Sequence, residues 1–120
     1  MFEASCHCGN VQFKATDPPE SLTSCNCSIC HRIGALWAYY PAKDVELTLN
    51  QSQGIAYSWG EKKFTFHTCD NCGSTTHYTS KRKDGTNQVA INARMAEISS
   101  TENIRIRYFD GAKSWKYVNE

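Results

Sequence analysis

From residue 25 the sequence reads Cys25-Asn26-Cys27-Ser28-Ile29-Cys30, which places three cysteines within six residues. Two further clusters lie on either side of it along the chain, Cys6-His7-Cys8 and Cys69-Asp70-Asn71-Cys72-Gly73, and the three clusters together contain all seven cysteines. Cysteines separated by one or two residues can turn both sulfurs toward one ion, and tetrahedral metal sites are built from such pairs. The spacing therefore predicts a structure organised around metal-bound thiolates.

The seven thiols divide into a set of four and a set of three. A closed tetrahedral site takes two ligands from each of two loops, and the first and last clusters supply that number. The ligands predicted for this closed site are Cys6, Cys8, Cys69 and Cys72. The remaining Cys25, Cys27 and Cys30 can bind a second ion and leave its fourth position to water or substrate, which is typical of catalytic zinc. Thiolate ligands favour zinc, although iron, an iron–sulfur cluster and copper also accept them.

Two alternatives to this division stay open. A disulfide framework would leave one of the seven thiols unpaired, and it needs an oxidising compartment. In the other alternative, His31 or His7 completes the ligand set of the cysteine triplet, and both ions are then structural and inert. Lone histidines are more often surface residues or partners of a ligand than ligands themselves, so we assign no histidine as a metal ligand.

Length and charge exclude several classes of protein. A chain of 120 residues is typical of one domain, and we expect residues 1–120 to form it. A net charge of +1 predicts no nucleic-acid partner. The longest apolar run, Ala35–Tyr40, is far shorter than the roughly 20 residues of a membrane span. The first residues lack the basic start and apolar stretch of a secretory signal, so we expect a cytoplasmic protein with reduced thiols.

Apolar and polar residues alternate along most of the chain, which is the two-residue period of half-buried strands. The pattern predicts eight or nine short strands, among them residues 11–15, 45–49, 55–59, 64–66, 89–93, 104–108 and 115–117. Short helices are expected near Cys27–Ile33 and Arg94–Ser99. The predicted fold class is mainly β, with short antiparallel strands, little helix, and alternating Trp and Tyr residues that pack as scaffold.

The three cysteine clusters, in this order, with Gly9-Asn10-Val11 after the first and Cys72-Gly73-Ser74 at the last, resemble the glutathione-dependent formaldehyde-activating (GFA) family. The resemblance extends from about Cys6 to Tyr78, and its most specific segment is Cys25–Gly34. The centromere protein V group shares this domain. The resemblance therefore points to the family more firmly than to the reaction.

The resemblance implies a single GFA-like β-tent domain with two zinc ions per chain: a structural ion on the closed four-cysteine set and a catalytic ion on Cys25, Cys27 and Cys30. The implied activity is that of a carbon–sulfur lyase, which joins formaldehyde to the thiol of glutathione reversibly and yields S-(hydroxymethyl)glutathione. The sequence departs from the family pattern at two places. Leu22-Thr23-Ser24 offers no histidine before the triplet, and His77 stands where an aromatic or aliphatic residue is usual.

Glutathione carries two carboxylates, so basic groups should lie near the open ion, and Arg32 is the first candidate for binding it. Further candidates are Lys62, Lys63, Lys81 and Arg82. The alternative function is a zinc-stabilised thiol-binding or protein-interaction module without catalysis. Such a module could bind a protein through strand edges or through the aromatic stretch Leu36–Tyr40. The sequence is also compatible with a homo-oligomer joined at edge strands.

Overall fold

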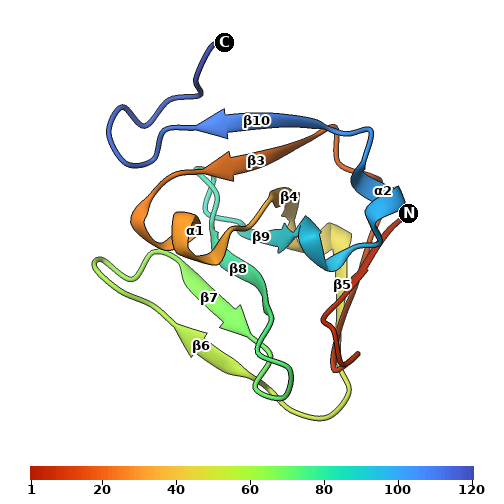
Figure 1. Cartoon of the computed structure of the whole chain (residues 1–120). Helices are drawn as coiled ribbons and strands as arrows, with labels where there is room; N and C mark the ends of the chain where they lie inside the picture. Colours follow the sequence, from red (N-terminus) through yellow and green to blue (C-terminus); the bar gives the residue numbers. More distant parts are fainter.

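The computed structural model describes residues 1–120 and contains two sheets and a few short helical segments (Figure 1). One sheet has three strands in the spatial order β1 (Phe2–Ser5), β2 (Val11–Ala15) and β5 (Val45–Leu49). The other has seven, in the spatial order β10 (Arg105–Phe109), β3 (Ser21–Cys25), β4 (Trp37–Pro41), β9 (Asn87–Asn92), β8 (Thr75–Lys81), β7 (Thr65–Thr68) and β6 (Ile55–Tyr57). The helical segments are α1 (Ser28–Ile33), η1 (Ala42–Asp44), η2 (Ala93–Met95) and α2 (Ile98–Thr101). The predicted mainly β class is therefore confirmed.

Neighbouring strands are antiparallel with one exception, the pair β3 and β10, which runs parallel. The register of this pair runs from Arg105 beside Ser21 to Phe109 beside Cys25. Parallel neighbours need a long connection, and here the connection contains most of the chain. Figure 1 shows the two strands side by side at the edge of the large sheet. The pairing places the last part of the chain next to the first cysteine of the triplet.

The large sheet is covered on both faces at β4. Ala38 and Tyr40 pack in a core cluster with the strands of the small sheet, whereas Trp37 packs in a second cluster on the other side. Trp37 and Ala38 are both completely buried. A strand buried on both faces has a continuous apolar run rather than an alternating one, which is why Leu36–Tyr40 shows no strand period. Trp37, Ala38 and Tyr40 are buried in this interior strand and Tyr39 alone is exposed, so the stretch does not form the protein-binding surface that the sequence suggests.

One row of side chains across the large sheet forms an aromatic surface. The strand register aligns Phe66 of β7 with Tyr78 of β8. It also aligns Tyr78 with Ala90 of β9, and Ala90 with Tyr39 of β4. Residues directly opposite one another share a face of a sheet, so these four side chains lie on the same side. Ala90 is small and fully buried, and the rings of Tyr39 and Tyr78 approach across it with centroids 6.3 Å apart.

The strands predicted at residues 11–15 and 45–49 are confirmed, and those predicted from residues 55, 64, 89 and 104 are confirmed with shifted ends. The helix predicted near residue 27 is α1, whereas the one predicted near residue 94 consists of two short pieces, η2 and α2. The structure has ten strands, and the sequence pattern misses four of them, β1, β3, β4 and β8. The strand predicted at residues 115–117 is wrong. Trp115 has a φ of 58°, and Tyr117 makes only an isolated bridge to Phe109.

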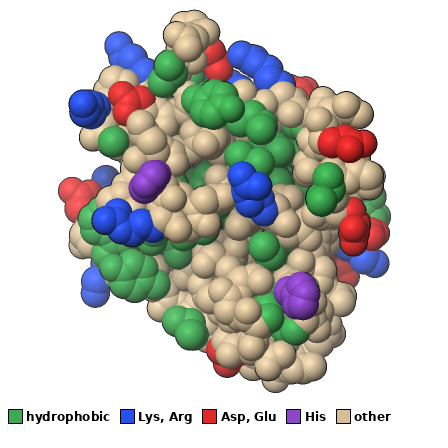
Figure 2. All heavy atoms as spheres, viewed as in Figure 1, with side chains coloured by type: hydrophobic (Ala, Val, Ile, Leu, Met, Phe, Trp, Pro, Cys, Tyr) green, Lys and Arg blue, Asp and Glu red, His purple; other side chains and the backbone are tan.

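The longest helical segment has six residues, and none has the length or hydropathy of a membrane span. On the face shown in Figure 2, basic and acidic side chains are interspersed, and hydrophobic side chains form patches between them. This distribution agrees with the net charge of +1. Recognition of a ligand therefore depends on local features of the surface rather than on an extended field of one sign.

Candidate metal centres and the adjoining cavities

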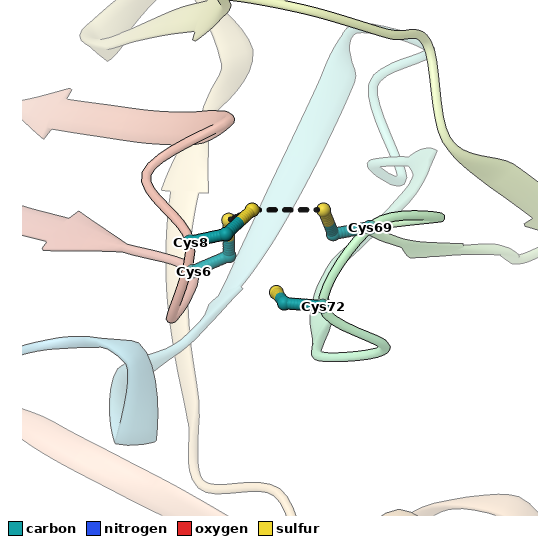
Figure 3. A group of neighbouring side chains, drawn as sticks. All are labelled: Cys6, Cys8, Cys69 and Cys72. Atoms are coloured by element: carbon teal, nitrogen blue, oxygen red, sulfur yellow. Dashed lines mark hydrogen bonds between the residues drawn. The ribbon is translucent and has the colours of Figure 1, made fainter.

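Four cysteines from two turns point toward one another (Figure 3). Cys6 and Cys8 lie in the connection between β1 and β2, and Cys69 and Cys72 lie in the connection between β7 and β8. The sulfurs of Cys6 and Cys8 are 3.7 Å apart, and those of Cys8 and Cys69 are 3.6 Å apart. A tetrahedral zinc ion with bonds of about 2.3 Å spaces its sulfurs about 3.8 Å apart, whereas a disulfide needs about 2.05 Å. The four thiols therefore fit a zinc ion.

Hydrogen-bonding groups contact the sulfurs of this four-cysteine cluster. The backbone N–H of Val11 donates to Cys6 Sγ at 3.2 Å. Ser74 Oγ lies 3.4 Å from Cys72 Sγ, and this contact lowers the pKa of the Cys72 thiol to about 5. Backbone hydrogen bonds also lower the pKa of Cys69, whereas burial raises the pKa of Cys6. A lowered pKa favours the thiolate, which is the form of cysteine that binds a metal.

Asn10 ties the four-cysteine cluster to a neighbouring loop. Its side chain is fully buried, and its Nδ2 donates to Cys69 Sγ at 3.7 Å. Its Oδ1 accepts hydrogen bonds from the backbone N–H groups of Gln51 and Ser52, at 2.6 and 3.1 Å. The loop between β5 and β6 is thereby held against the cysteines. Sequence reasoning did not select Asn10, because an asparagine after a glycine ordinarily indicates only a turn.

The second group of cysteines is built by the connection from β3 to α1. Cys25 ends β3, Cys27 is the N-cap of α1, and Cys30 lies in the first turn of the helix. Their three sulfurs lie within 4.8 Å of one another. The backbone N–H of Cys30 donates to Cys27 Sγ at 3.4 Å, as the side chain of an N-cap residue should accept it. Gly34 ends the helix with a φ of 72°, in the left-handed conformation that favours glycine.

Cys30 is the buried member of the triplet, and Trp37 provides its partner. The indole Nε1–H of Trp37 donates to Cys30 Sγ at 3.3 Å. The neighbouring Cys30 thiol lowers the pKa of Cys25 to about 6, and the neighbouring Cys25 thiol, together with burial, raises the pKa of Cys30. The triplet therefore carries negative charge near neutral pH, as a cation site requires.

The triplet contains three cysteines, and no His, Asp or Glu side chain joins the group. His31 and His7, the two alternative fourth ligands, are both exposed, and neither belongs to it. Three thiolates with no fourth side chain fit a zinc ion that keeps one position for another ligand. The arrangement thus brings together the two ligand sets that the spacing predicts, one of four cysteines and one of three.

Two cavities adjoin the triplet. The larger, of about 560 Å³, reaches Cys25 and Cys30, and we call it the aromatic cavity because Tyr39, Phe66 and Tyr78 of the aromatic row line it. The smaller, of about 460 Å³, reaches Cys27. Volumes in this range hold small organic ligands. A ligand at the open position of the triplet could therefore extend into a formed cavity.

The C-terminal segment completes the aromatic cavity, and Asn26 fastens this segment to the cysteine loop. Asn26 Nδ2 donates to Asp110 Oδ1, and Asn26 Oδ1 accepts from the backbone N–H of Ala112, both at 3.0 Å. The backbone N–H of Asn26 also donates to the carbonyl of Phe109 at 3.2 Å. The side chain of Asn26 lies between two of the cysteines in sequence, yet its contacts are with residues more than 80 positions away.

Tyr117 is a second point of attachment for this segment, and its ring lines the aromatic cavity. Its hydroxyl lies 2.9 Å from Thr23 Oγ1 of β3. The guanidinium of Arg107 stacks over its ring, 3.7 Å from the centroid, and Arg107 also pairs with Glu120 at 2.7 Å. These contacts with β3 and β10 fix the position of the tyrosine ring at the cavity.

Gly111 lies so close to the triplet that a side chain does not fit. A Cβ atom at this position would be 2.7 Å from Cys25 Sγ and 3.1 Å from Cys27 Cβ. Real Cβ atoms essentially never approach a neighbour this closely. In the sequence, Asp110-Gly111 indicates only a turn, so the role of this glycine beside the cysteines was not predictable.

Arg32, the predicted glutathione contact, lies on the exposed side of α1, where its Nη1 donates to the carbonyl of Ser28 at 2.8 Å. It lines neither cavity at the triplet, and its role in binding glutathione stays a prediction. Lys63 lines the smaller cavity and pairs with Glu61 at 2.9 Å. Lys83, which the sequence marks only as part of a turn, is the charged residue that lines the aromatic cavity.

His77 lies on the face of β8 away from the aromatic cavity. It is 4% exposed, its ring stacks on that of His67 at 4.3 Å, and its Nδ1 lies 2.8 Å from Thr76 Oγ1. Its edge contacts the ring of Phe13 in the small sheet. Burial, reinforced by the neighbouring His67, lowers the pKa of His77 to about 3. The ring is therefore a neutral core residue, in the place where the family pattern has an apolar side chain.

Comparisons with known proteins agree with this geometry. The structure is similar to the crystal structure of a Rhodobacter sphaeroides protein, a structural genomics target, with a TM-score of 0.68 and 21% sequence identity over 87% of this chain and 98% of that one. At this identity the similarity supports the fold alone. A search of curated proteins finds no match. The sequence model of the family described as glutathione-dependent formaldehyde-activating enzyme matches residues 1–108. The chain therefore belongs to the GFA family.

Proposed function

We propose that the protein is a zinc-dependent carbon–sulfur lyase that acts on an adduct of glutathione and an aldehyde, of the S-(hydroxymethyl)glutathione synthase type. The observation that carries the proposal is the cysteine triplet with no fourth side-chain ligand, which adjoins a cavity in a chain of the GFA family. In the forward direction the thiol sulfur bonds to the carbonyl carbon, and the thiol proton passes to the carbonyl oxygen. The reaction needs no oxidant or reductant, and we place it in the cytoplasm, where thiols stay reduced.

Each residue near the triplet has a role in this proposal. Cys25, Cys27 and Cys30 hold the catalytic zinc ion, which supplies positive charge that lowers the pKa of a thiol beside it. Trp37 donates its N–H to Cys30 and so stabilises negative charge on that ligand. Arg32 is one candidate to pair with a carboxylate of glutathione.

The four-cysteine cluster has a structural role in the proposal, since all four positions of its ion are filled by the chain. Its ligands are Cys6, Cys8, Cys69 and Cys72. Cys6 and Cys69 are buried, so this ion has little access to solvent or substrate. It links two turns that are 61 residues apart and joins the small sheet to the large one.

The test is an exchange measurement at equilibrium. Formaldehyde and glutathione interconvert spontaneously with their adduct, so magnetisation-transfer NMR can measure the exchange rate with and without zinc-loaded protein. We expect the protein to accelerate exchange, and we expect Cys27→Ser to return it to the spontaneous rate while zinc stays bound at the four-cysteine cluster. Equal rates with and without the wild-type protein would refute catalysis.

One observation favours a second candidate, an interaction module without catalysis. β6 is an edge strand of the large sheet, and Ile55, Tyr57 and Trp59 at this edge are each more than half exposed. Exposed strand edges with apolar side chains can pair with another chain. A wild-type protein that binds two non-exchangeable zinc ions and gives no exchange acceleration would favour this candidate.

A further inference from the structure

The aromatic cavity is larger and more apolar than formaldehyde requires. Formaldehyde has two heavy atoms, whereas the cavity has a volume of about 560 Å³ and nine hydrophobic residues among the eleven that line it. Three of its aromatic side chains, Tyr39, Phe64 and Trp115, are 40%, 39% and 63% exposed. Concave apolar surface of this kind is typical of a small-molecule site, and its aromatic lining suits a planar ring.

The charge of the aromatic cavity also differs from what glutathione requires. Glutathione carries two carboxylates and one ammonium group, but Lys83 is the one basic residue that lines this cavity, together with the thiols of Cys25 and Cys30 that are proposed to bind the ion, and Gln88 is the one side-chain amide. A single cation in an apolar wall fits a ligand with a single anionic group. Glutathione itself is therefore better placed on the solvent side of the triplet, and the aromatic cavity is left for the other half of the adduct.

The end of β10 and the C-terminal segment after it supply three aromatic residues of the cavity lining. Phe109, Trp115 and Tyr117 line the cavity, and all three lie beyond residue 108, where the match to the family ends. The ring of Phe109 contacts those of Trp115 and Tyr117 edge-on, with centroids 5.1 and 5.0 Å away. These three residues of the cavity lining thus lie outside the segment that matches the family model, whereas Tyr39, Phe66 and Tyr78 lie inside it.

We infer that the aromatic cavity binds the aldehyde half of the adduct, and that this half is an aromatic ring carrying one carboxylate-like anionic group that pairs with Lys83. The inference rests on the proposed function for its chemistry and deepens it by naming the substrate class. The thiol sulfur bonds to the aldehyde carbon at the triplet end of the cavity, and the thiol proton passes to the aldehyde oxygen. Atoms balance without a further reactant, and the reverse reaction releases the same aldehyde.

Binding is tested apart from reaction by using unreactive alcohols in place of aldehydes. The probes are 4-(hydroxymethyl)benzoate, which has both ring and anion, benzyl alcohol, which has only the ring, and glycolate, which has only the anion. Dissociation constants are measured by NMR titration of the zinc-loaded full chain. We expect 4-(hydroxymethyl)benzoate to bind at least about tenfold more tightly than either of the others. Equal affinity for all three probes would overturn the inference.

Two matched pairs of variants locate the bound probe. Lys83→Ala should weaken binding of 4-(hydroxymethyl)benzoate about tenfold, whereas Lys81→Ala, which removes the same charge from the same hairpin outside the cavity, should leave it unchanged. Trp115→Asn should also weaken binding because it removes an indole that lines the aromatic cavity, and asparagine is chosen because it tolerates the positive φ of this residue. Trp59→Asn is its control: it removes an exposed indole that lines only the smaller cavity, so binding should not change. Equal losses within either pair would contradict the assignment.

A second measurement separates this inference from the proposed function. The exchange of glutathione with 4-carboxybenzaldehyde is compared with the exchange of glutathione with formaldehyde, each with and without protein. Preferential acceleration of the aromatic exchange supports both. Selective binding of 4-(hydroxymethyl)benzoate without acceleration of either exchange refutes the lyase and leaves the cavity assignment standing. Acceleration with formaldehyde but no selective binding refutes the cavity assignment alone.

Discussion

The indole N–H of Trp37 donates to the sulfur of Cys30, and this hydrogen bond joins the interior of the large sheet to the cysteine triplet. Trp37 is completely buried, and its ring also meets the edge of Tyr78 in the floor of the aromatic cavity, with centroids 4.7 Å apart. The same side chain therefore positions a thiolate and supports the cavity beside it. Core packing and the chemistry of the site are coupled at this residue.

Trp37→Phe should weaken zinc binding at the triplet selectively. The change removes the N–H donor, and a hydrogen bond to a charged group contributes about 1.5–3 kcal/mol, so we expect the affinity of this ion to fall tenfold or more. The four-cysteine cluster should keep its zinc. Competition with a chelator, followed by native mass spectrometry, measures the two ions separately.

Phe66→Leu provides the control for lost packing, since Phe66 belongs to the same core cluster and donates no hydrogen bond. Both variants should lose a similar amount of stability. If Phe66→Leu releases the triplet zinc as readily as Trp37→Phe does, the hydrogen bond is not what holds Cys30 as a ligand.

Cys69→Ser and Cys27→Ser should have opposite consequences. Cys69 belongs to the closed cluster, whose proposed structural zinc would contribute directly to folding, so its loss should lower the thermal midpoint by more than about 10 °C or abolish cooperative unfolding. Cys27→Ser should leave the midpoint nearly unchanged and remove the exchange activity. Thermal unfolding is measured by circular dichroism. Equal destabilisation by the two changes would mean that both ions are structural.

Gly111→Ala should disturb the triplet although Gly111 is not a ligand. The added methyl group would lie 2.7 Å from Cys25 Sγ, so either the C-terminal segment or the cysteine loop has to move. We expect a severalfold loss of exchange activity and of triplet zinc affinity, measured with the zinc-loaded protein. Ala112→Ser adds one heavy atom at the next, exposed position and should change neither quantity. A fully active Gly111→Ala variant would show that the segment does not hold the triplet.

His77→Phe should reduce the loss of stability in acid. The pKa of His77 is about 3 in the folded chain and about 6.5 when unfolded, so between these values the unfolded chain binds the extra proton. Stability is therefore lost as the pH falls from 6.5 toward 3, and at pH 5 this single group accounts for about 2 kcal/mol. The difference in unfolding free energy between pH 7 and pH 5, measured in urea, should be smaller by about that amount in the variant.

Acid also protonates the cysteines of the four-cysteine cluster and of the triplet. This contribution to the pH dependence is the same in the wild-type protein and in His77→Phe, so it cancels in the comparison. His67, which stacks on His77, has a pKa lowered by its own burial. His67→Phe is therefore the matched control, and it should show a smaller effect because His67 is less buried. An unchanged pH dependence in His77→Phe would show that folding does not lower the pKa of His77.

The cysteine spacing predicted much of the site because metal ligation is a local and chemically narrow requirement. Two residues between Cys69 and Cys72, or one between Cys6 and Cys8, suffice to bring sulfurs together, and the structure groups all seven thiols as the spacing predicts. The assignment of these groups as structural and catalytic ligands stays a prediction, as does the extent of the domain over residues 1–120.

The strands were predictable where one face is buried and the other is exposed. Residues 11–15 alternate and form β2, whereas β4 is buried on both faces and β8 is rich in threonine, so neither shows the two-residue period. The error at residues 115–117 has a related cause. Trp115 and Tyr117 alternate with Lys116, but these aromatic rings line a cavity instead of packing between strands.

Contacts between distant segments were outside the reach of the sequence pattern. Nothing in the residues around Asn26 indicates Asp110 as a partner, because the contact exists only once β10 has paired with β3. The same is true of Lys83, which a hairpin brings to the edge of a cavity whose other walls are set by the rest of the fold. Substrate selection depends on such contacts, which is why the family is easier to identify than the aldehyde.

The parallel pairing of β10 with β3 has a consequence for the order in which the nascent chain matures. All ligands of the closed cluster have left the ribosome once residue 72 is exposed, so zinc can staple the early part of the chain while synthesis continues. The rings of Phe109, Trp115 and Tyr117 emerge among the last dozen residues. The four-cysteine cluster can therefore form before the aromatic residues of the C-terminal segment are made, and a ribosome stalled before residue 109 would present the triplet without that part of the cavity lining.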